Sequence, residues 1–502
     1  MMGNMPAVKN GFDNEKYLVL QSDNIKERIS RFGGKLYLEF GGKMFDDFHA
    51  SRVLPGFEPD SKISMLMQLR DEAEIIIVIN SGDIEKNKVR GDTGVTYDLE
   101  VLRMIDVFRD RGLMVGGIVL TQYNSQPAAD RFMKRLAALD IKVYRHYLIP
   151  GYPHDIPLIV SDSGYGKNDH IRTERSLVIV TGPGSGSGKM AACLSQMYHD
   201  HKNGIRSGYA KFETFPIWNL PLGHPVNLAY ESATADLNDV NITDPYHLKA
   251  YGKEAVNYNR DIETFPVLSA IMEKIAGMSV YRSPTDMGVN MAGMCIIDDD
   301  VVKNASRQEI IRRYYAAKCA VKEGLGTDAA AGKIETVMKQ AGITVEDRKV
   351  VAPVREAAAG TDRAVVGIEL RNGTVITGKS SPLMHASAAM LMNTLKTLGN
   401  IDDSIPLISP SVIGPVRDMK TIYLGNKRPR LRADEILIAL SVSAATSPIA
   451  DMAFRKLPEL KGCEAHSSVI LPAVDEQLFR QLGINVTCEP QYQTANLYRG
   501  TE

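Results

Sequence analysis

Short apolar runs alternate with amphipathic stretches from residue 35 to residue 180. The runs have the length of strands and lie at 35–40, 74–80, 115–121, 142–148 and 177–181. Between them, 97–111 and 127–139 place apolar side chains at helical spacing, and the second stretch opens with Pro127, a residue that favours the first turn of a helix. This alternation predicts an α/β fold with a mostly parallel, doubly wound sheet covered by helices on both faces.

The second half of the chain indicates a further domain. Helical patterns occur at 261–276, 306–323 and 329–341. The last of them ends at Gly342, and a charged connector follows. We therefore predict an α/β domain over 1–342, divisible into 1–175 and 176–342, and a C-terminal α/β domain over 343–502. In that domain, 365–377 forms two alternating runs joined by Asn372-Gly373, a dipeptide whose tolerance of positive φ suits a tight hairpin.

Bulk properties exclude several classes of protein. A chain of 502 residues is expected to form more than one hydrophobic core. Its 59 basic and 60 acidic side chains give a formal charge of -1, so no global electrostatic field attracts nucleic acid or a membrane. No apolar run approaches the roughly 20 residues that span a bilayer, and residues 1–14 lack a secretory signal. Five scattered cysteines argue against disulfides. We expect a cytoplasmic protein, and its size class is compatible with a homo-oligomer.

The strongest chemical signal is a glycine-rich turn at residues 182–189, here called the glycine loop. It follows the apolar strand at 177–181 and precedes a helix-like segment over 190–200. Glycines let backbone N–H groups converge, the start of a helix adds a positive dipole end, and a lysine adds a mobile cation, so a phosphate fits there. The predicted phosphate-binding residues are Gly182, Gly184, Ser185, Gly186, Ser187, Gly188 and Lys189.

The loop departs from the nucleoside-triphosphate pattern at two positions. That pattern has glycine six residues before the lysine, where this chain has Pro183 with Gly182 one residue further away. It also has Ser or Thr after the lysine to hold magnesium, and this chain has Met190. The loop could be one residue longer, with Ser185 or Ser187 supplying a hydroxyl, or it could bind phosphate without a metal. A structural turn that only lets strand and helix pack closely is a further alternative.

Acidic positions downstream are candidates for Mg²⁺ beside ATP or another nucleotide. An apolar run ends at Asp298, as in the magnesium-holding strand of a phosphoryl-transfer site, and Asp236 lies in a polar stretch that follows a predicted strand. The aspartates at 298–300 could equally be charges at the start of a helix, or a solvated turn. Nothing in the sequence indicates zinc, haem or an iron–sulfur cluster.

Two further strand ends carry polar residues. If 206–212 is the strand next to the glycine loop, Glu213 emerges on the same rim, because the carboxyl ends of parallel strands form the ligand crevice. We predict that Glu213 acts in proton transfer or positioning, while a polar surface excursion is the alternative. After the predicted strand at 35–40, we predict a secondary anion contact formed by Gly41, Gly42, Lys43, His49 and Arg52. The alternative at this strand end is a turn with a salt-linked surface.

A hydrolytic function is a second hypothesis. Residues 184–188 read Gly-Ser-Gly-Ser-Gly, which satisfies the five-residue spelling of a serine nucleophile elbow. A peptidase or amidase would use Ser187 or Ser185 as nucleophile and a histidine such as His224 as base. The multiple flanking glycines and the lysine favour a phosphate cradle at these positions.

Four strings resemble a bacterial protein family of unknown function, and the likeness extends over nearly the whole chain. They are Thr-Gly-Pro-Gly-Ser-Gly-Ser-Gly-Lys-Met from Thr181, Tyr-Ala-Lys-Phe-Glu-Thr-Phe-Pro-Ile-Trp-Asn-Leu-Pro-Leu from Tyr209, His-Pro-Val-Asn-Leu-Ala-Tyr-Glu from His224, and Ser-Pro-Thr-Asp-Met-Gly-Val-Asn from Ser283. Some members of that family carry the label ATP-dependent peptidase. The resemblance implies nucleotide binding more than proteolysis, because this sequence contains no protease constellation that matches residue by residue.

The sequence therefore predicts a protein that binds a small phosphorylated ligand at the glycine loop. Whether it is an enzyme stays open, and so does the reaction class, because ligase, kinase and hydrolase chemistry all use a phosphate grip. A non-catalytic ligand sensor or scaffold is the third hypothesis.

Overall fold

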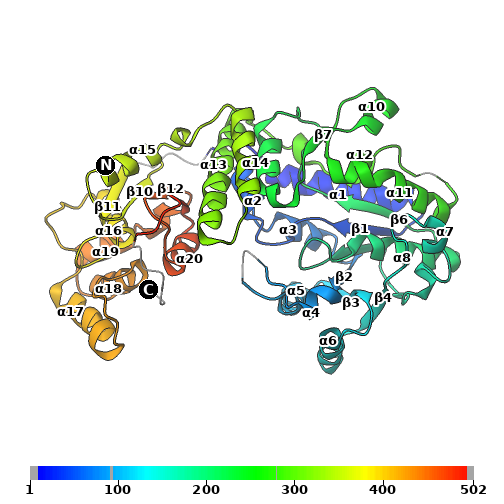
Figure 1. The fold of residues 1–502 in the computed structure, drawn as a ribbon, viewed down its shortest axis with the longest axis horizontal. Coiled ribbons are helices and arrows are strands. Elements are labelled where there is room, and N and C mark those ends of the chain that lie inside the picture. Colours follow the sequence, from blue (N-terminus) through cyan, green and yellow to red (C-terminus); the bar gives the residue numbers. More distant parts are fainter. Residues whose placement is uncertain (1–8, 91–93, 279, 494–502) are drawn as a thin grey trace. The chain divides into compact units, whose positions relative to one another are not determined.

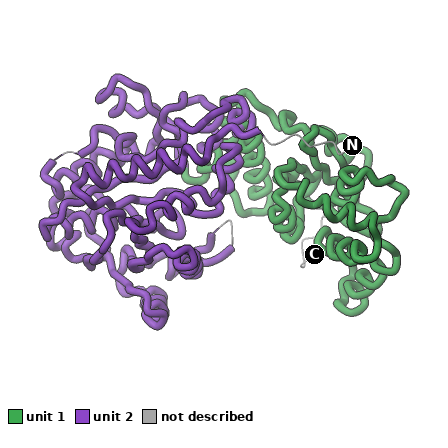
Figure 2. Tube along the Cα trace, turned by 180° about the vertical axis from the view of Figure 1, so that it is seen from behind, with its two compact units in different colours: residues 1–8, 232–237, 307–502 green, residues 9–231, 238–306 purple. Residues whose placement is uncertain are grey.

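The computed structural model describes residues 9–90, 94–278 and 280–493. The chain forms two compact units (Figure 2). The one called the first unit here contains 9–231 and 238–306 and is drawn purple, as unit 2 of the figure's key; the one called the second unit contains 232–237 and 307–493 of the described residues and is drawn green, as unit 1 of the key. No helix in these described ranges is long and apolar enough to cross a bilayer.

A seven-stranded parallel sheet forms the centre of the first unit (Figure 1), in the order β4-β3-β2-β5-β1-β6-β9. The predicted parallel α/β fold is confirmed, and each of the five predicted strands lies within two residues of its expected bounds. The strands of the sheet are β1 (Leu36–Phe40), β2 (Ala73–Asn80), β3 (Met114–Tyr123), β4 (Val143–Tyr147), β5 (Leu177–Thr181), β6 (Gly208–Phe212) and β9 (Gly288–Val289). A separate antiparallel pair joins β7 (Asn241–Thr243) and β8 (Val256–Tyr258).

The central strands are apolar because helices cover both of their faces. All five residues of β5 are buried, as are the first seven of β2, which explains their continuous rather than alternating apolar runs. On one face, Tyr37 and Tyr209 pack in a core with Cys193 of α8 (Lys189–Lys202) and Leu268 of α11 (Asn259–Ala276).

Several helices of the first unit begin at a residue whose side chain caps them. At the start of α1 (Asn14–Arg31), for example, the Asp13 carboxylate accepts the Lys16 amide hydrogen at 3.0 Å. The other helices up to residue 287 are α2 (Phe48–Val53), α3 (Ser61–Gln68), α4 (Ser81–Glu85), α5 (Tyr97–Asp110), α6 (Pro127–Ala138), α7 (Ile156–Ile159), α9 (Pro225–Ala233), α10 (Pro245–Tyr251) and α12 (Pro284–Met287).

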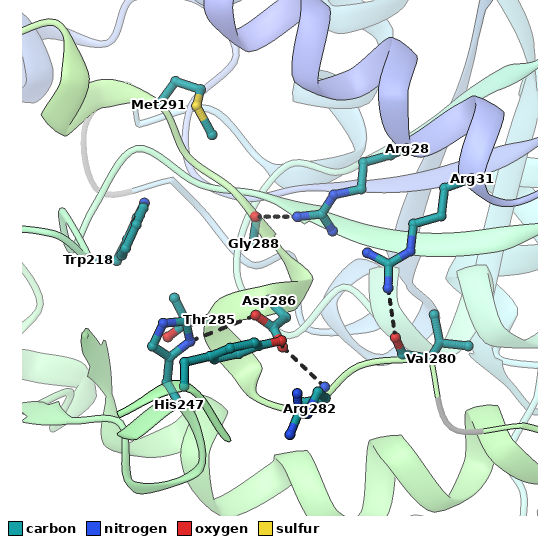
Figure 3. Close-up of a pocket in the computed structure, with 11 residues that line it drawn as sticks. Arg28, Arg31, Trp218, His247, Val280, Arg282, Thr285, Asp286, Gly288 and Met291 are labelled. Carbon is teal, nitrogen blue, oxygen red and sulfur yellow. Dashed lines mark hydrogen bonds and ion pairs between the residues drawn. The ribbon is translucent and has the colours of Figure 1, made fainter. Parts of the chain in front are cut away.

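A cavity of about 390 Å³ lies in the first unit, beside the edge strand β9 (Figure 3). Its walls come from the end of α1, from α10, from the segment after β6 and from residues 280–291. It therefore unites parts of the chain that are far apart in sequence.

A mixed four-stranded sheet forms the centre of the second unit, in the order β11-β10-β12-β13, and confirms the predicted C-terminal α/β architecture. Its strands are β10 (Val365–Glu369), β11 (Val375–Lys379), β12 (Glu464–Ser467) and β13 (Asn485–Cys488). The helices from residue 299 onward are α13 (Asp299–Glu323), α14 (Asp328–Gln340), α15 (Val351–Ala359), α16 (Ala386–Gly399), α17 (Pro410–Asp418), α18 (Ala433–Ala444), α19 (Pro448–Phe454) and α20 (Ala473–Gln481).

The predicted hairpin between β10 and β11 is present, with a turn one residue longer than a two-residue loop. The Gly373 amide donates to the Leu370 carbonyl at 2.8 Å, and the Leu370 amide donates to the Thr374 carbonyl at 2.9 Å. Gly373 has φ 83°, whereas Asn372 stays on the negative side, so only the glycine uses its conformational freedom.

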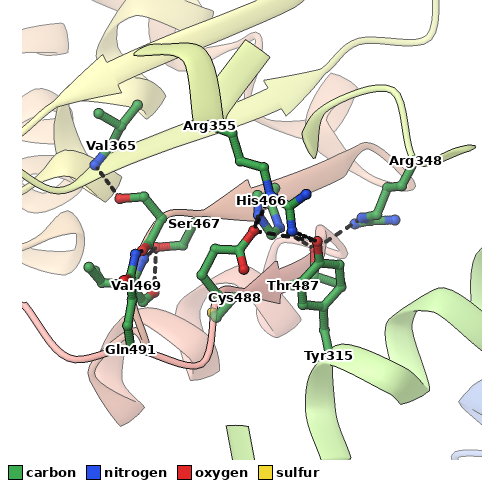
Figure 4. A network of polar contacts seen from close by, with 12 residues as sticks. Tyr315, Arg348, Arg355, Val365, His466, Ser467, Val469, Thr487, Cys488 and Gln491 are labelled. Atoms are coloured by element: carbon green, nitrogen blue, oxygen red, sulfur yellow. Dashed lines mark hydrogen bonds and ion pairs between the residues drawn. The ribbon is translucent and has the colours of Figure 1, made fainter. Parts of the chain in front are cut away.

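A buried arginine ties this sheet together (Figure 4). Arg348 is 1% exposed and donates to Thr487 Oγ1 at 3.0 Å, to the carbonyls of Ala465 and Asn485, and to the Glu464 carboxylate. Glu464 also accepts two hydrogen bonds of 2.9 Å from Arg312 of α13. Each nitrogen of this guanidinium group donates to an acceptor on β12 or β13, so the buried charge is compensated.

Replacing Arg348 by alanine should destabilise the second unit strongly. The change leaves the Thr487 hydroxyl and two strand carbonyls without their donor and creates a cavity, at a cost of about 3–5 kcal/mol in the free energy of unfolding. Scanning calorimetry of the full chain measures this as a lower melting temperature. Arg363→Ala, at an exposed position of the same unit, is the matched control. Equal melting temperatures for the two variants would refute the structural role of Arg348.

Candidate functional site

Three neighbouring strand ends form one edge of the parallel sheet. β5, β1 and β6 are adjacent and parallel, so the glycine loop after β5, Gly41 after β1 and Glu213 after β6 emerge on the same side. In open parallel sheets, ligands bind at the carboxyl ends of the strands. The sheet therefore brings together the two strongest predicted features, the glycine loop and Glu213.

The carbonyl oxygens of the glycine loop are held by side chains. Gly184 O accepts from Ser187 Oγ at 3.0 Å and from Lys189 Nζ at 3.4 Å. Thr121 Oγ1 donates to Ser187 O at 2.7 Å, and Asn80 Nδ2 donates to Gly186 O at 3.4 Å. Side-chain donors on β2, β3 and α8 thus hold the loop in place by hydrogen bonds to its carbonyl oxygens.

The amide N–H groups of the same loop have no such partners. Within the described residues, no hydrogen bond is formed by the amides of Gly184, Ser185, Gly186, Ser187, Gly188 and Lys189. They precede α8, whose first turn adds further free N–H groups and the positive end of the helix dipole. A run of unpaired donors next to a lysine is the arrangement that binds an oxyanion.

Two glycines are required by the space around the loop. A Cβ on Gly184 would collide with the hydroxyl of Tyr97, which is itself buried. Gly188 has φ 89°, and a Cβ there would meet Thr121 at 3.0 Å. The glycines therefore allow a tight approach of backbone to neighbouring side chains, in addition to any role in binding.

Lys189 points into the loop rather than toward solvent. Burial lowers the pKa of its ammonium group, and the negative charge of Glu39 on β1 opposes that shift. Within the described residues, no carboxylate forms an ion pair with Lys189, and the only acceptor of Nζ is the carbonyl of Gly184. A half-buried cation that lacks an ion-pair partner favours an anionic ligand.

Glu213 belongs to a half-enclosed charge cluster at the end of β6. Its Oε1 lies 2.7 Å from Lys211 Nζ, and the same ammonium group also contacts Asp261 and the Tyr258 hydroxyl. Burial raises the pKa of Glu213 to about 7, and Lys211 opposes the shift while Asp261 adds to it. A carboxyl group with this pKa can both accept and donate a proton near neutral pH.

Glu39 lies on the strand between the loop and this cluster. Its Oε2 accepts the Tyr209 hydroxyl at 2.6 Å, and its charge acts on the pKa of both Lys189 and Lys211. The loop and the Glu213 cluster are therefore electrostatically coupled parts of one site.

Sequence reasoning missed Lys211 and Asp261. The sequence contained a signal for Lys211, because it lies two residues before Glu213 and residues two apart along a strand point to the same face of the sheet. Asp261 had none, since it arrives from α11 through tertiary packing.

The residues of the predicted secondary anion contact lie on the segment from β1 to α2. The Gly41 amide donates to Phe212 O at 3.2 Å, so it is already used within the sheet. A Cβ on Gly42 would lie 3.5 Å from Lys62 Nζ, and the ring of His49 packs at 5.4 Å from that of Phe215. Lys43 is exposed and Arg52 is half-buried.

The two predicted metal positions have different surroundings. Asp298 accepts the Val301 amide at 3.1 Å at the start of α13, as the helix-start alternative expects. Asp236 is exposed and belongs to the second unit, whereas Asp298 belongs to the first. In the described part of the chain, no group of three or more His, Cys, Asp or Glu side chains is arranged to hold a metal ion.

The hydrolytic hypothesis requires a serine next to a histidine. Ser187 is fully buried and donates to Gly184 O, while Ser185 is exposed. His224 Nε2 lies 2.9 Å from Asp299, and its Nδ1 accepts the Val226 amide at 3.3 Å. No hydrogen bond in the described ranges joins either serine to a histidine, so the geometry favours the phosphate cradle.

These features define a class of protein: a parallel α/β protein with a glycine-rich, lysine-containing loop at the carboxyl edge of its sheet. Comparison with known proteins then gives the family. Residues 10–342 match the domain of unknown function DUF1846, N-terminal, and residues 346–498 match its C-terminal counterpart. The chain belongs to this bacterial family.

Streptococcal relatives match over almost their whole length. The UPF0371 protein of Streptococcus thermophilus strain LMG 18311 is 55% identical over 98% of this chain and 99% of its own. The UPF0371 protein of Streptococcus pyogenes serotype M5 is 54% identical over 97% of this chain and 99% of its own.

Replacing Glu213 by glutamine should remove a pH dependence of stability. Because its folded pKa lies above the unfolded value, the folded protein retains a proton that the unfolded chain releases. This stabilisation is complete below pH 4.5 and is lost as the pH rises through about 7. Across that window the wild type should lose about 3 kcal/mol more than Glu213→Gln, which urea titrations at several pH values measure. The control is Glu263→Gln, at an exposed position of α11. Parallel stability curves for wild type and Glu213→Gln would contradict the raised pKa.

Proposed function

We propose that this protein binds a nucleotide, such as ATP, or another phosphorylated small molecule at the glycine loop, in the cytoplasm. The phosphate accepts hydrogen bonds from the loop amides and pairs with Lys189. One observation carries the proposal: a half-buried ammonium group without an ion pair adjoins a run of backbone donors that have no partner among the described residues.

The hydrogen bonds of the loop support an anion over a structural turn. In this loop the side chains of Ser187, Thr121 and Asn80 satisfy carbonyl oxygens and leave the donors available.

Glu213 gives the site a capacity for proton transfer. Its pKa of about 7 and its contact with Lys211 suit a group that takes a proton from, or gives one to, a ligand held by the loop. The matched domains are of unknown function, and the proposal commits to the phosphate grip and to the proton-transfer group.

The test is ligand-induced thermal stabilisation of the full chain. The panel contains ATP, other nucleotides, sugar phosphates and inorganic phosphate, each with and without Mg²⁺. A ligand at 100 times its Kd stabilises the folded state by about 2.7 kcal/mol. Lys189→Met retains the aliphatic stem but removes the charge, and should weaken binding at least about tenfold.

The control variant is Lys134→Met, at an exposed position of α6, which should retain the full stabilisation. A panel that leaves the melting temperature of the wild type unchanged would refute phosphate binding at the loop. So would stabilisation that is equal in Lys189→Met and the wild type.

A further inference from the structure

The cavity beside β9 has the chemistry of a second ligand site. It lies at the edge of the sheet, separated from the glycine loop by β1 and β6. Strand spacing of about 4.8 Å places β5 and β9 roughly 14 Å apart, so the cavity is distinct from the loop.

Positive charge dominates the cavity wall. Arg28, Arg31 and Arg282 line it, and none of them forms an ion pair with a carboxylate in the part of the chain that the structure describes. Arg28 donates to Gly288 O at 3.1 Å and Arg31 to Val280 O at 3.1 Å, as Figure 3 shows. Backbone carbonyls hold these guanidinium groups in place without neutralising them.

Asp286 is the only carboxylate among the described residues that line the cavity, and it is already engaged. Asp286 accepts from the Tyr251 hydroxyl at 2.8 Å and from the Arg282 amide at 3.1 Å, and it lies 3.7 Å from His247 (Figure 3). Three arginines against one occupied carboxylate leave an excess of positive charge. Guanidinium groups bind phosphate through paired N–H donors, so an anion with several oxygens fits this excess.

Aromatic rings form another side of the cavity. The Trp218 indole N–H donates to Asn290 O at 2.9 Å, which fixes the ring beside the opening. The His247 ring lies 4.7 Å from Tyr251 and 6.2 Å from Trp218, measured between ring centroids. Such rings contact the face of a planar group.

We propose that this cavity binds a small organic phosphate that carries a planar ring, of about the size of a nucleoside monophosphate. The phosphate pairs with the arginines, and the ring contacts Trp218 and Tyr251. The volume of about 390 Å³ lies within the range of small-molecule sites and exceeds the needs of inorganic phosphate alone. This site does not depend on the proposed function of the glycine loop.

The chain contains a single tryptophan, Trp218, so its intrinsic fluorescence reports on this cavity. We would titrate the full chain with phenyl phosphate, adenosine 5′-monophosphate, adenosine and inorganic phosphate. The two ring-bearing phosphates should change Trp218 emission saturably. Adenosine, without charge, and inorganic phosphate, without a ring, should bind at least about tenfold more weakly.

Arg31→Ala and Arg282→Ala should each raise the Kd of phenyl phosphate about tenfold or more, since each removes charge-assisted donors. Both positions are exposed, so the variants should fold, and their melting temperatures check this. Arg135→Ala, an exposed arginine on α6, is the matched control.

Lys189→Met separates this inference from the proposed function, because it should leave the fluorescence titration unchanged. The inference is overturned if neither ring-bearing phosphate changes Trp218 emission, if the arginine variants titrate like the wild type, or if Lys189→Met abolishes the response.

Discussion

A half-buried ammonium group without an ion pair in the described residues is the constraint from which the proposed site follows. Partial removal from water disfavours its charged form, and the Gly184 carbonyl and the more distant Glu39 offset part of that effect for Lys189. Side-chain donors bind the carbonyl oxygens of the loop, and the loop amides have no hydrogen-bond partner among the described residues. The loop is therefore held in a conformation that, under our proposal, an oxyanion completes.

The order of the strands turns this local geometry into a larger site. β1 lies between β5 and β6, so Glu39 stands between the loop and the Glu213 cluster. On the far side, Gly288 of β9 lines the arginine-rich cavity, and a Cβ there would lie 3.3 Å from Glu213 Oε2. Glu213, the proposed proton-transfer group, thus has a proposed anion site on each side of it, and Gly288 lies between it and the cavity.

Local features of the fold were predictable from the sequence, and features that depend on distant contacts were not. The apolar runs and the glycine loop are contiguous, so periodicity located β2 and β5. Glu213 does emerge at the same edge as the loop, but its strand β6 is not the neighbour of β5 that the prediction assumed, because β1 lies between them. The order of the strands, with β5 between β2 and β1, is fixed by packing. The cavity escaped detection for the same reason, because Arg28, Trp218 and Arg282 come from three separate regions. The resemblance identified the family, while the ligand and the reaction stay with the proposals.

The most direct test of the central claim is a crystal structure of the protein grown with a non-hydrolysable ATP analogue. The account predicts phosphate oxygens within hydrogen-bonding distance of the amides of the glycine loop, and Lys189 Nζ moved from the Gly184 carbonyl onto the phosphate. A nucleotide bound elsewhere, with Lys189 still on Gly184 and the loop amides facing only solvent at saturating ligand, would contradict it.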